Sequence, residues 1–196
     1  MRKIIKILSV LIILLFSRTL VMAQLPIPVG IPAGIPTALP IGLPIPKVVA
    51  FGNFTYAIPN SGAFTEKYNN GTGFEVGGGF GLGKTMIIAS TGLINYTPKK
   101  DGVSNYKVVP IKVGIRRYIV AGLFLNAQIG MAKQTFTNTL GQDDNRTGFL
   151  YEFGAGIKVL HIIELGADYT GYTTGDLSGI STAKVLLVKA GFVIKI

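Results

Sequence analysis

Eight strand-like runs constrain this 196-residue chain more than any other feature of its sequence. Within most of these runs, large apolar residues alternate with small or polar ones, which is the period of a β-strand with one apolar face. Each run is close in length to the roughly 9–11 residues that a tilted strand needs to cross a bilayer. The expected strands are residues 48–58, 71–82, 85–96, 106–119, 123–136, 148–159, 162–172 and 184–196.

The connections between these runs alternate in length. Long polar segments (residues 59–70, 97–105, 137–147 and 173–183) alternate with connections of two or three residues (83–84, 120–122 and 160–161). Long loops at one end and tight turns at the other are typical of outer-membrane barrels, which place the short turns in the periplasm. An even number of strands would bring both ends of the barrel to the turn side. The sequence therefore predicts an all-β, eight-stranded antiparallel up-and-down transmembrane β-barrel.

The two faces of the runs indicate what surrounds the barrel. In residues 184–196, Leu186, Val188 and Phe192 share one face, while Lys189 and Lys195 share the other. Four other runs alternate in the same way with glycine frequent on the polar face, whereas residues 48–58 and 85–96 leave their faces unassigned. A narrow lumen needs small residues with a few charges between them, but a soluble barrel would turn this glycine-rich face to water. We therefore expect lipid to contact the apolar face.

Composition agrees with a barrel and excludes several other classes. Hydrophobic residues make up 48% of the chain, yet no apolar run of about 20 residues follows the N-terminal segment. The chain has no cysteine, which excludes disulfides, thiolate metal sites and a lipobox anchor. Its formal charge of +10 falls to about +6 without Arg2, Lys3, Lys6 and Arg18. The remaining basic residues form no cluster longer than a pair, which argues against a nucleic-acid surface.

Two segments precede the expected barrel (48–196). Residues 1–23 have the form of a signal peptide, with a basic start, a short apolar core and the small-residue end Val21-Met22-Ala23. In the linker, residues 24–47, a Pro/Gly-rich tetrapeptide repeat places proline at nearly every fourth position. Such spacing prevents a helix or central strand and favours an extended strap. The strap is either a plain linker or a segment that docks on the barrel mouth or a periplasmic partner.

In these features the chain resembles the small eight-stranded outer-membrane β-barrel proteins of the OmpA/OmpX-like type, over about residues 48–196. The resemblance implies a place in the outer membrane of a Gram-negative bacterium, in contact with outer-membrane lipid. It also implies that the barrel-insertion machinery recognises the C-terminal strand. In that family the last strand usually ends in Phe, whereas here the last residue is Ile196 and Phe192 lies four positions earlier.

Eight charged residues on the polar faces would point into the lumen: Glu75, Lys112, Arg116, Glu152, Lys158, Glu164, Asp168 and Lys189. Symmetric pairing about the last loop would set Asp168 opposite Lys189, and the preceding pair of strands would set Lys158 near Glu164. Charges withdrawn from water must be paired, so a structural ion network is the first interpretation. A narrow ion path or gate is the alternative, although eight strands leave an interior that side chains nearly fill.

Seven tyrosines cluster toward the ends of the expected strands: Tyr56, Tyr96, Tyr106, Tyr118, Tyr151, Tyr169 and Tyr172. Because the chain has no tryptophan, an interfacial aromatic girdle would have to consist of tyrosine and phenylalanine. We therefore expect these tyrosines to face the membrane interfaces.

Two other motifs carry little chemistry. Residues 78–85 (GGFGLGKT) match the phosphate-loop pattern, but a strand-like run follows where such a loop needs a helix. His161, the single histidine, falls in an expected periplasmic turn, which fits neither a multi-histidine metal site nor a hydrolase at the outer rim. No catalytic, metal or cofactor-binding residue is assigned, and no cofactor is expected.

The expected function is that of a non-enzymatic integral outer-membrane barrel with exposed loops, which serves envelope integrity or surface interaction. A narrow porin-like channel for ions or small solutes is the second hypothesis, and a soluble secreted barrel that binds an apolar ligand is the third. The loops bear few charges, among them Asp143, Asp144, Arg146 and Lys99-Lys100. These charges identify no surface ligand.

Overall fold

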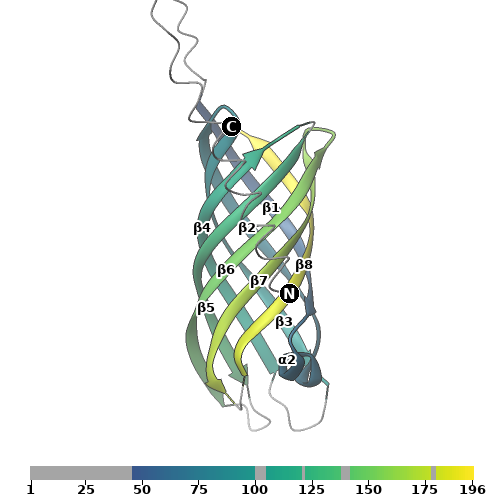
Figure 1. The fold of residues 1–196 in the computed structure, drawn as a ribbon, viewed down its shortest axis with the longest axis vertical. Helices are drawn as coiled ribbons and strands as arrows, with labels where there is room; N and C mark the ends of the chain where they lie inside the picture. The colour runs from purple at the N-terminus through teal and green to yellow at the C-terminus, as the bar shows by residue number, and fades with distance from the viewer. Residues whose placement is uncertain (1–45, 100–104, 121, 138–141, 178–179) are drawn as a thin grey trace, which may run out of the picture. The chain divides into compact units, whose positions relative to one another are not determined.

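A computed structural model describes residues 46–99, 105–120, 122–137, 142–177 and 180–196 as an eight-stranded barrel with one short helix (Figure 1). The expected signal peptide and nearly all of the linker lie outside these residues, so the three-part division of the chain remains a prediction. The elements are β1 (Pro46–Pro59), α2 (Gly62–Lys67), β2 (Tyr68–Leu82), β3 (Thr85–Pro98), β4 (Asn105–Tyr118), β5 (Leu123–Thr137), β6 (Asp143–Val159), β7 (Ile163–Leu177) and β8 (Ile180–Lys195).

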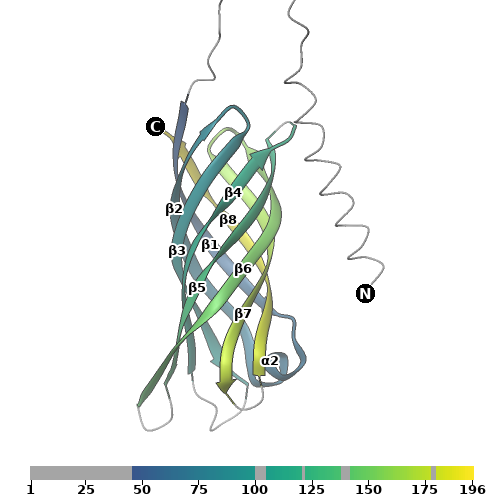
Figure 2. The same ribbon diagram turned by 60° about the vertical axis from the view of Figure 1, so that its left-hand side comes forward.

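Every strand pairs antiparallel with its neighbour in sequence, and β1 pairs with β8 to close the barrel. The seam between these two strands runs from Val49 opposite Lys195 to Pro59 opposite Val185. Figures 1 and 2 show the three tight turns at one end of the barrel and α2 at the other, which we call the turn end and the loop end. The expected up-and-down topology is thus confirmed. Among the described residues, no helix is long and apolar enough to cross a membrane.

The loop end contains more regular structure than expected. Residues 137–147 and 173–183 were predicted to be loops, but β6 already begins at Asp143, and β7 and β8 reach Leu177 and Ile180. The predicted loop at residues 59–70 contains α2. Near this rim both faces of a strand are polar, so the alternation that marks a half-buried strand disappears. Side-chain bonds such as Thr135 Oγ1 to Asn145 Oδ1 (2.8 Å) link the strands there instead.

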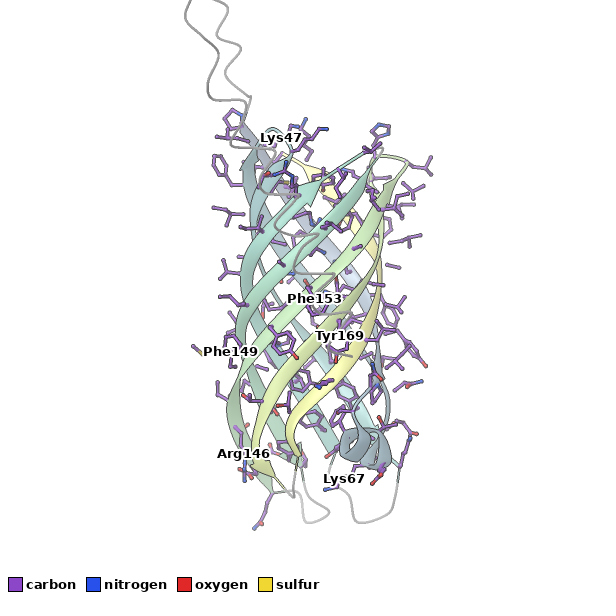
Figure 3. The ribbon with its side chains drawn as sticks, viewed as in Figure 1. Lys47, Lys67, Arg146, Phe149, Phe153 and Tyr169 are labelled. Carbon is purple, nitrogen blue, oxygen red and sulfur yellow. The ribbon has the colours of Figure 1, made fainter. Side chains whose placement is uncertain are left out.

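The outer face of the wall is apolar, as the alternation predicted. Ile111 and Met131 are 64% and 62% exposed, and Phe153 and Tyr169 lie on the outer face with ring centroids 5.3 Å apart (Figure 3). The structure also assigns the two strands that the sequence left open. Inward-facing residues of β1 and β3 form a turn-side apolar cluster with one residue of β8: Val49, Phe51, Met86, Ile88 and Val193.

The girdle prediction is wrong for four of the seven tyrosines. Tyr96, Tyr106 and Tyr172 are at most 2% exposed and belong to an apolar cluster inside the loop end. The cause is strand phase, because each of them shares a face with lumen residues, as Tyr106 does with Lys112 in β4. Tyr118 is also turned inward, against the turn-side cluster. The remaining three, Tyr56, Tyr151 and Tyr169, share the phase of the outward apolar residues.

Candidate functional site: a filled lumen

An ion network occupies the middle of the lumen. We define it as Glu75, Lys112, Glu152, Asp168 and Lys189, all at most 6% exposed. The Lys189 ammonium lies 2.7 Å from carboxylate oxygens of both Glu75 and Glu152, and 2.8 Å from Asp168. Lys112 joins the same two glutamates from the other side, at 3.0 and 2.9 Å. Each cation is therefore shared, which ties five strands together through their side chains.

Strand register determines which of these groups meet. Asp168 does not lie directly opposite Lys189, as the sequence suggested: its Cα partner is Leu187, and that of Lys189 is Gly166. The two charges still form an ion pair, because a long lysine side chain reaches the diagonal neighbour across the strand pair. The register predicted for the β7–β8 hairpin, symmetric about its loop, was therefore wrong by two residues. The Lys189 side chain spans this offset to reach Asp168.

A second ion pair lies nearer the turn end. The Arg116 guanidinium donates to both carboxylate oxygens of Glu164, at 3.0 and 2.8 Å, and its Nε donates to Asn126 Oδ1 at 2.9 Å. The same guanidinium lies 4.3 Å from the centroid of the Phe124 ring, which adds a cation–π contact. Lys158 is the Cα partner of Glu164, as expected. It nevertheless forms no ion pair among the described residues, because Arg116 occupies that carboxylate.

Uncharged polar residues complete the network, and the sequence reasoning missed them. Gln128 Nε2 and Thr170 Oγ1 donate to the Glu152 carboxylate at 3.2 and 2.8 Å, and Ser90 Oγ donates to Gln128 Oε1. Their strand phase could have revealed them, since Thr170 shares the face of Asp168, and Gln128 that of Asn126. Bonds of this kind satisfy carboxylate lone pairs that two ammonium groups leave open.

Glycine in the wall makes room for the network. A Cβ atom added at Gly154 would overlap Asp168 Oδ1 and the backbone of β7. Gly156 leaves similar space for the Phe124 ring, on which Arg116 rests. The glycine-rich polar face noted in the sequence is therefore the volume into which large lumen side chains fit.

An aromatic plug closes the loop end. It consists of Phe64, Tyr68, Tyr96, Tyr106 and Tyr172, and Phe64 comes from α2. The Phe64 ring centroid lies 5.0–5.5 Å from those of Tyr68, Tyr96 and Tyr106. The buried hydroxyls have partners, since Tyr172 donates to Tyr96 at 3.1 Å and Tyr106 donates to Gln134 at 2.7 Å. The plug is thus both packed and hydrogen-bonded.

Contacts with neighbouring strands hold α2 over the plug. Lys99 Nζ donates to the carbonyl oxygen of Thr65 at 2.6 Å, and the backbone amide of Lys99 donates to the carbonyl oxygen of Lys67 at 2.8 Å. On the other side, the Asn60 amide donates to the Lys184 carbonyl at 2.7 Å. The helix is therefore attached to strands on both sides of the opening that it covers.

The space left in the lumen is small. One void of about 10 Å³ lies between the plug and the ion network, and a second of the same size lies between the network and Arg116. Each has room for about one water molecule. The Thr55 hydroxyl lines the first void and has no hydrogen-bond partner. Among the described residues, the ion network lies between these two voids, with the aromatic plug beyond the first void and Arg116 beside the second.

The structure also places the two motifs that the sequence analysis set aside, and both lie at turns. Within the described ranges, no group of three His, Asp or Glu side chains could hold a metal. His161 lies in the β6–β7 turn with a φ of 65°, and Gly83 and Lys84 form the β2–β3 turn, where Gly83 has a φ of 61°. The phosphate-loop pattern thus corresponds to the end of one strand, a tight turn and the start of the next strand.

These features define a class: a small eight-stranded β-barrel of the outer-membrane type, with an apolar outer wall and a filled lumen. No protein-family model matches the chain, and no curated protein matches its sequence. Solved structures do match. The N-terminal barrel of OprF from Pseudomonas aeruginosa superposes with a TM-score of 0.54 at 14% identity, covering 75% of this chain and 97% of that one.

Two further barrels are similar to the same extent. Neisserial surface protein A gives a TM-score of 0.50 at 15% identity, over 77% of this chain and 97% of its own. The outer-membrane protein Ail of Yersinia pestis, in a phospholipid bilayer nanodisc, gives 0.51 at 15% identity, over 74% and 99%. At such low identities the likeness is one of fold, and it confirms the fold that the sequence pattern predicted.

Proposed function

We propose that this protein is a non-enzymatic, integral outer-membrane barrel with a closed lumen, which contributes to envelope integrity or surface interaction through its loop end. The filled lumen is the observation that carries the proposal. Lysine, arginine and carboxylate groups inside are paired with one another, and an aromatic plug covers them. A barrel filled in this way is suited to act as a rigid platform in the membrane.

The absence of enzymatic activity is part of the proposal. Each carboxylate of the ion network contacts an ammonium group, and Arg116 occupies Glu164, so these acids are engaged in structure. The similar folds support a role at the surface and in lipid, because one is described as a surface protein and another was solved in a phospholipid bilayer.

We further propose how the chain is exported and inserted. Residues 1–23 would direct secretion and be removed. The barrel-insertion machinery would then recognise β8 and Ile196, which present Phe192, Ile194 and Ile196 on the lipid-facing side, each at least 63% exposed. Besides the insertion machinery, the partner that we propose for this protein is outer-membrane lipid.

Two measurements test the proposal. Detergent-extracted protein should migrate differently on gels before and after boiling, as a folded barrel does, and recovery in the soluble periplasm would refute membrane insertion. In planar bilayers the folded protein should give no stable open-channel steps, with a general porin as the positive control. Large, stable conductance would refute the closed lumen and favour the narrow-channel alternative.

A further inference from the structure

The turn end of the barrel carries an unbalanced positive charge. Its cations are Lys47, Lys84, Arg117, Lys158 and Lys195, each in or near a tight turn or at a strand end. The exposed acids of the described residues, Glu66, Asp143 and Asp144, all lie at the loop end. Four further acids, Glu75, Glu152, Glu164 and Asp168, are buried in the lumen. Figure 3 shows Lys47 at one end of the barrel and Lys67 and Arg146 at the other.

Few of these turn-end cations are engaged elsewhere. Lys47 Nζ donates to the Gly83 carbonyl at 3.0 Å and Lys84 Nζ to the Ile119 carbonyl at 3.2 Å, so these two steady the turns. Arg117, Lys158 and Lys195 form no ion pair within the described part of the chain. Arg117 has the opposite phase to Arg116, so it points out of the wall, whereas Arg116 points into the lumen. Lys158 and Lys195 share the phase of the lumen residues, but they lie at strand ends, where Lys158 is partly exposed and Lys195 is exposed.

Two of the turns, β4–β5 and β6–β7, expose apolar residues, which is unusual for turns in water. Val120 is 69% exposed, Leu160 74% and Ile162 54%. Leu82 and Leu123, at the turn-side ends of β2 and β5, are also exposed on the outer face. The apolar turn residues therefore continue the apolar outer face of the wall. Apolar groups rimmed by charged ones are typical of a surface that contacts a membrane or a partner. The apolar outer face therefore extends to the turn end of the barrel.

We propose that this turn-side collar, the five cations with Val120, Leu160 and Ile162, binds the phosphate groups of anionic phospholipid in the leaflet that surrounds the turns. Apolar tips immersed at the acyl–headgroup boundary would bring the flexible lysine and arginine side chains level with the phosphates. The inference rests on the proposed membrane location. It adds a lipid preference, and it places the barrel low in the bilayer with its loop end projecting.

Lipid selectivity in reconstituted vesicles tests the collar. The protein is folded into phosphatidylcholine vesicles, and the association of spin-labelled phosphatidylglycerol is compared with that of spin-labelled phosphatidylcholine by electron paramagnetic resonance. The parent barrel should prefer the anionic lipid by about fivefold or more, the factor expected for a single basic residue at an anionic surface. Added salt should reduce that preference, since exposed charges are screened.

Matched variants test whether the turn end or the loop end is responsible for the lipid preference. Arg117→Gln/Lys158→Gln/Lys195→Gln should lose most of the preference, while Lys107→Gln/Lys133→Gln/Lys184→Gln, which removes three loop-end cations, should keep it. If the triple collar variant does not fold by gel migration, the single variant Arg117→Gln should still lower the preference measurably. Equal loss in both triple variants, or no preference in the parent, would overturn the collar. Failure of the parent to insert into any vesicle would instead refute the proposed function.

Discussion

Replacing Lys189 by methionine tests the central claim that paired charges hold the lumen together. Lys189 is 6% exposed and is the cation shared by Glu75, Glu152 and Asp168. Methionine keeps the length of the side chain and removes its charge. Glu75 and Glu152 would retain Lys112, but among the described residues Asp168 would retain only the Asn126 amide, 3.4 Å away.

The expected loss of stability follows from this loss of partners. Removing one member of a buried ion pair typically destabilises a protein by about 3–5 kcal/mol, because the remaining charge is buried without compensation. Asp168→Asn alone should lower the free energy of unfolding by less, since Lys189 keeps its ion pairs with Glu75 and Glu152. The double variant Asp168→Asn/Lys189→Met should be more stable than the sum of the single effects predicts, by about 1–3 kcal/mol.

Unfolding by urea in phosphatidylcholine vesicles, followed by gel migration, measures these free energies. Lys107→Met serves as the control, because Lys107 is exposed on the outer face near the loop end; the substitution should leave stability within about 0.5 kcal/mol of the parent. A Lys189→Met barrel within about 1 kcal/mol of the parent would refute the reasoning. So would strict additivity in the double variant.

Three further changes probe the interior by the same assay. Gly154→Ala should destabilise or prevent folding, because its methyl group would overlap Asp168, whereas Gly52→Ala should be tolerated, since nothing lies within 4 Å of the added atom; equal effects would contradict this. Gln134→Leu should cost about 1–3 kcal/mol by leaving a tyrosine hydroxyl and a backbone carbonyl unpaired, and an unchanged midpoint would count against the plug. Thr55→Val should be neutral or slightly stabilising, because the buried hydroxyl it removes has no partner; a clear loss of stability would indicate a bond that the hydroxyl makes.

The strands were predictable because the middle of most of them alternates between an apolar outer residue and a polar or small inner one. Where the outer residue is apolar and the inner one charged, as in β4 with Ile111 and Lys112, the alternation identifies both the strand and its faces. In β1 and β3 the pattern fails because the inward Phe51 and Ile88 are as apolar as their outward neighbours. Apolar packing on both faces removes the contrast on which the prediction depends.

The aromatic plug was not predictable from composition or position along a strand. Tyrosine near a strand end fits an interfacial girdle or a lumen equally well, and strand phase alone separates the two for Tyr96 and Tyr172. Phe64 was hidden for another reason, because it lies in a short helix inside a segment predicted to be a loop. The network residues were recognisable by charge and phase, but the identity of each partner depended on register.

The seam between β1 and β8 has a consequence for biogenesis. It joins the first strand to the last, so no β1 edge can be covered until the final segment of the chain has arrived. Until then both edges present unpaired amides and carbonyls, which readily join other chains. Ring closure between such distant segments is also slow. The barrel therefore closes in a single late step, when β8 pairs with β1.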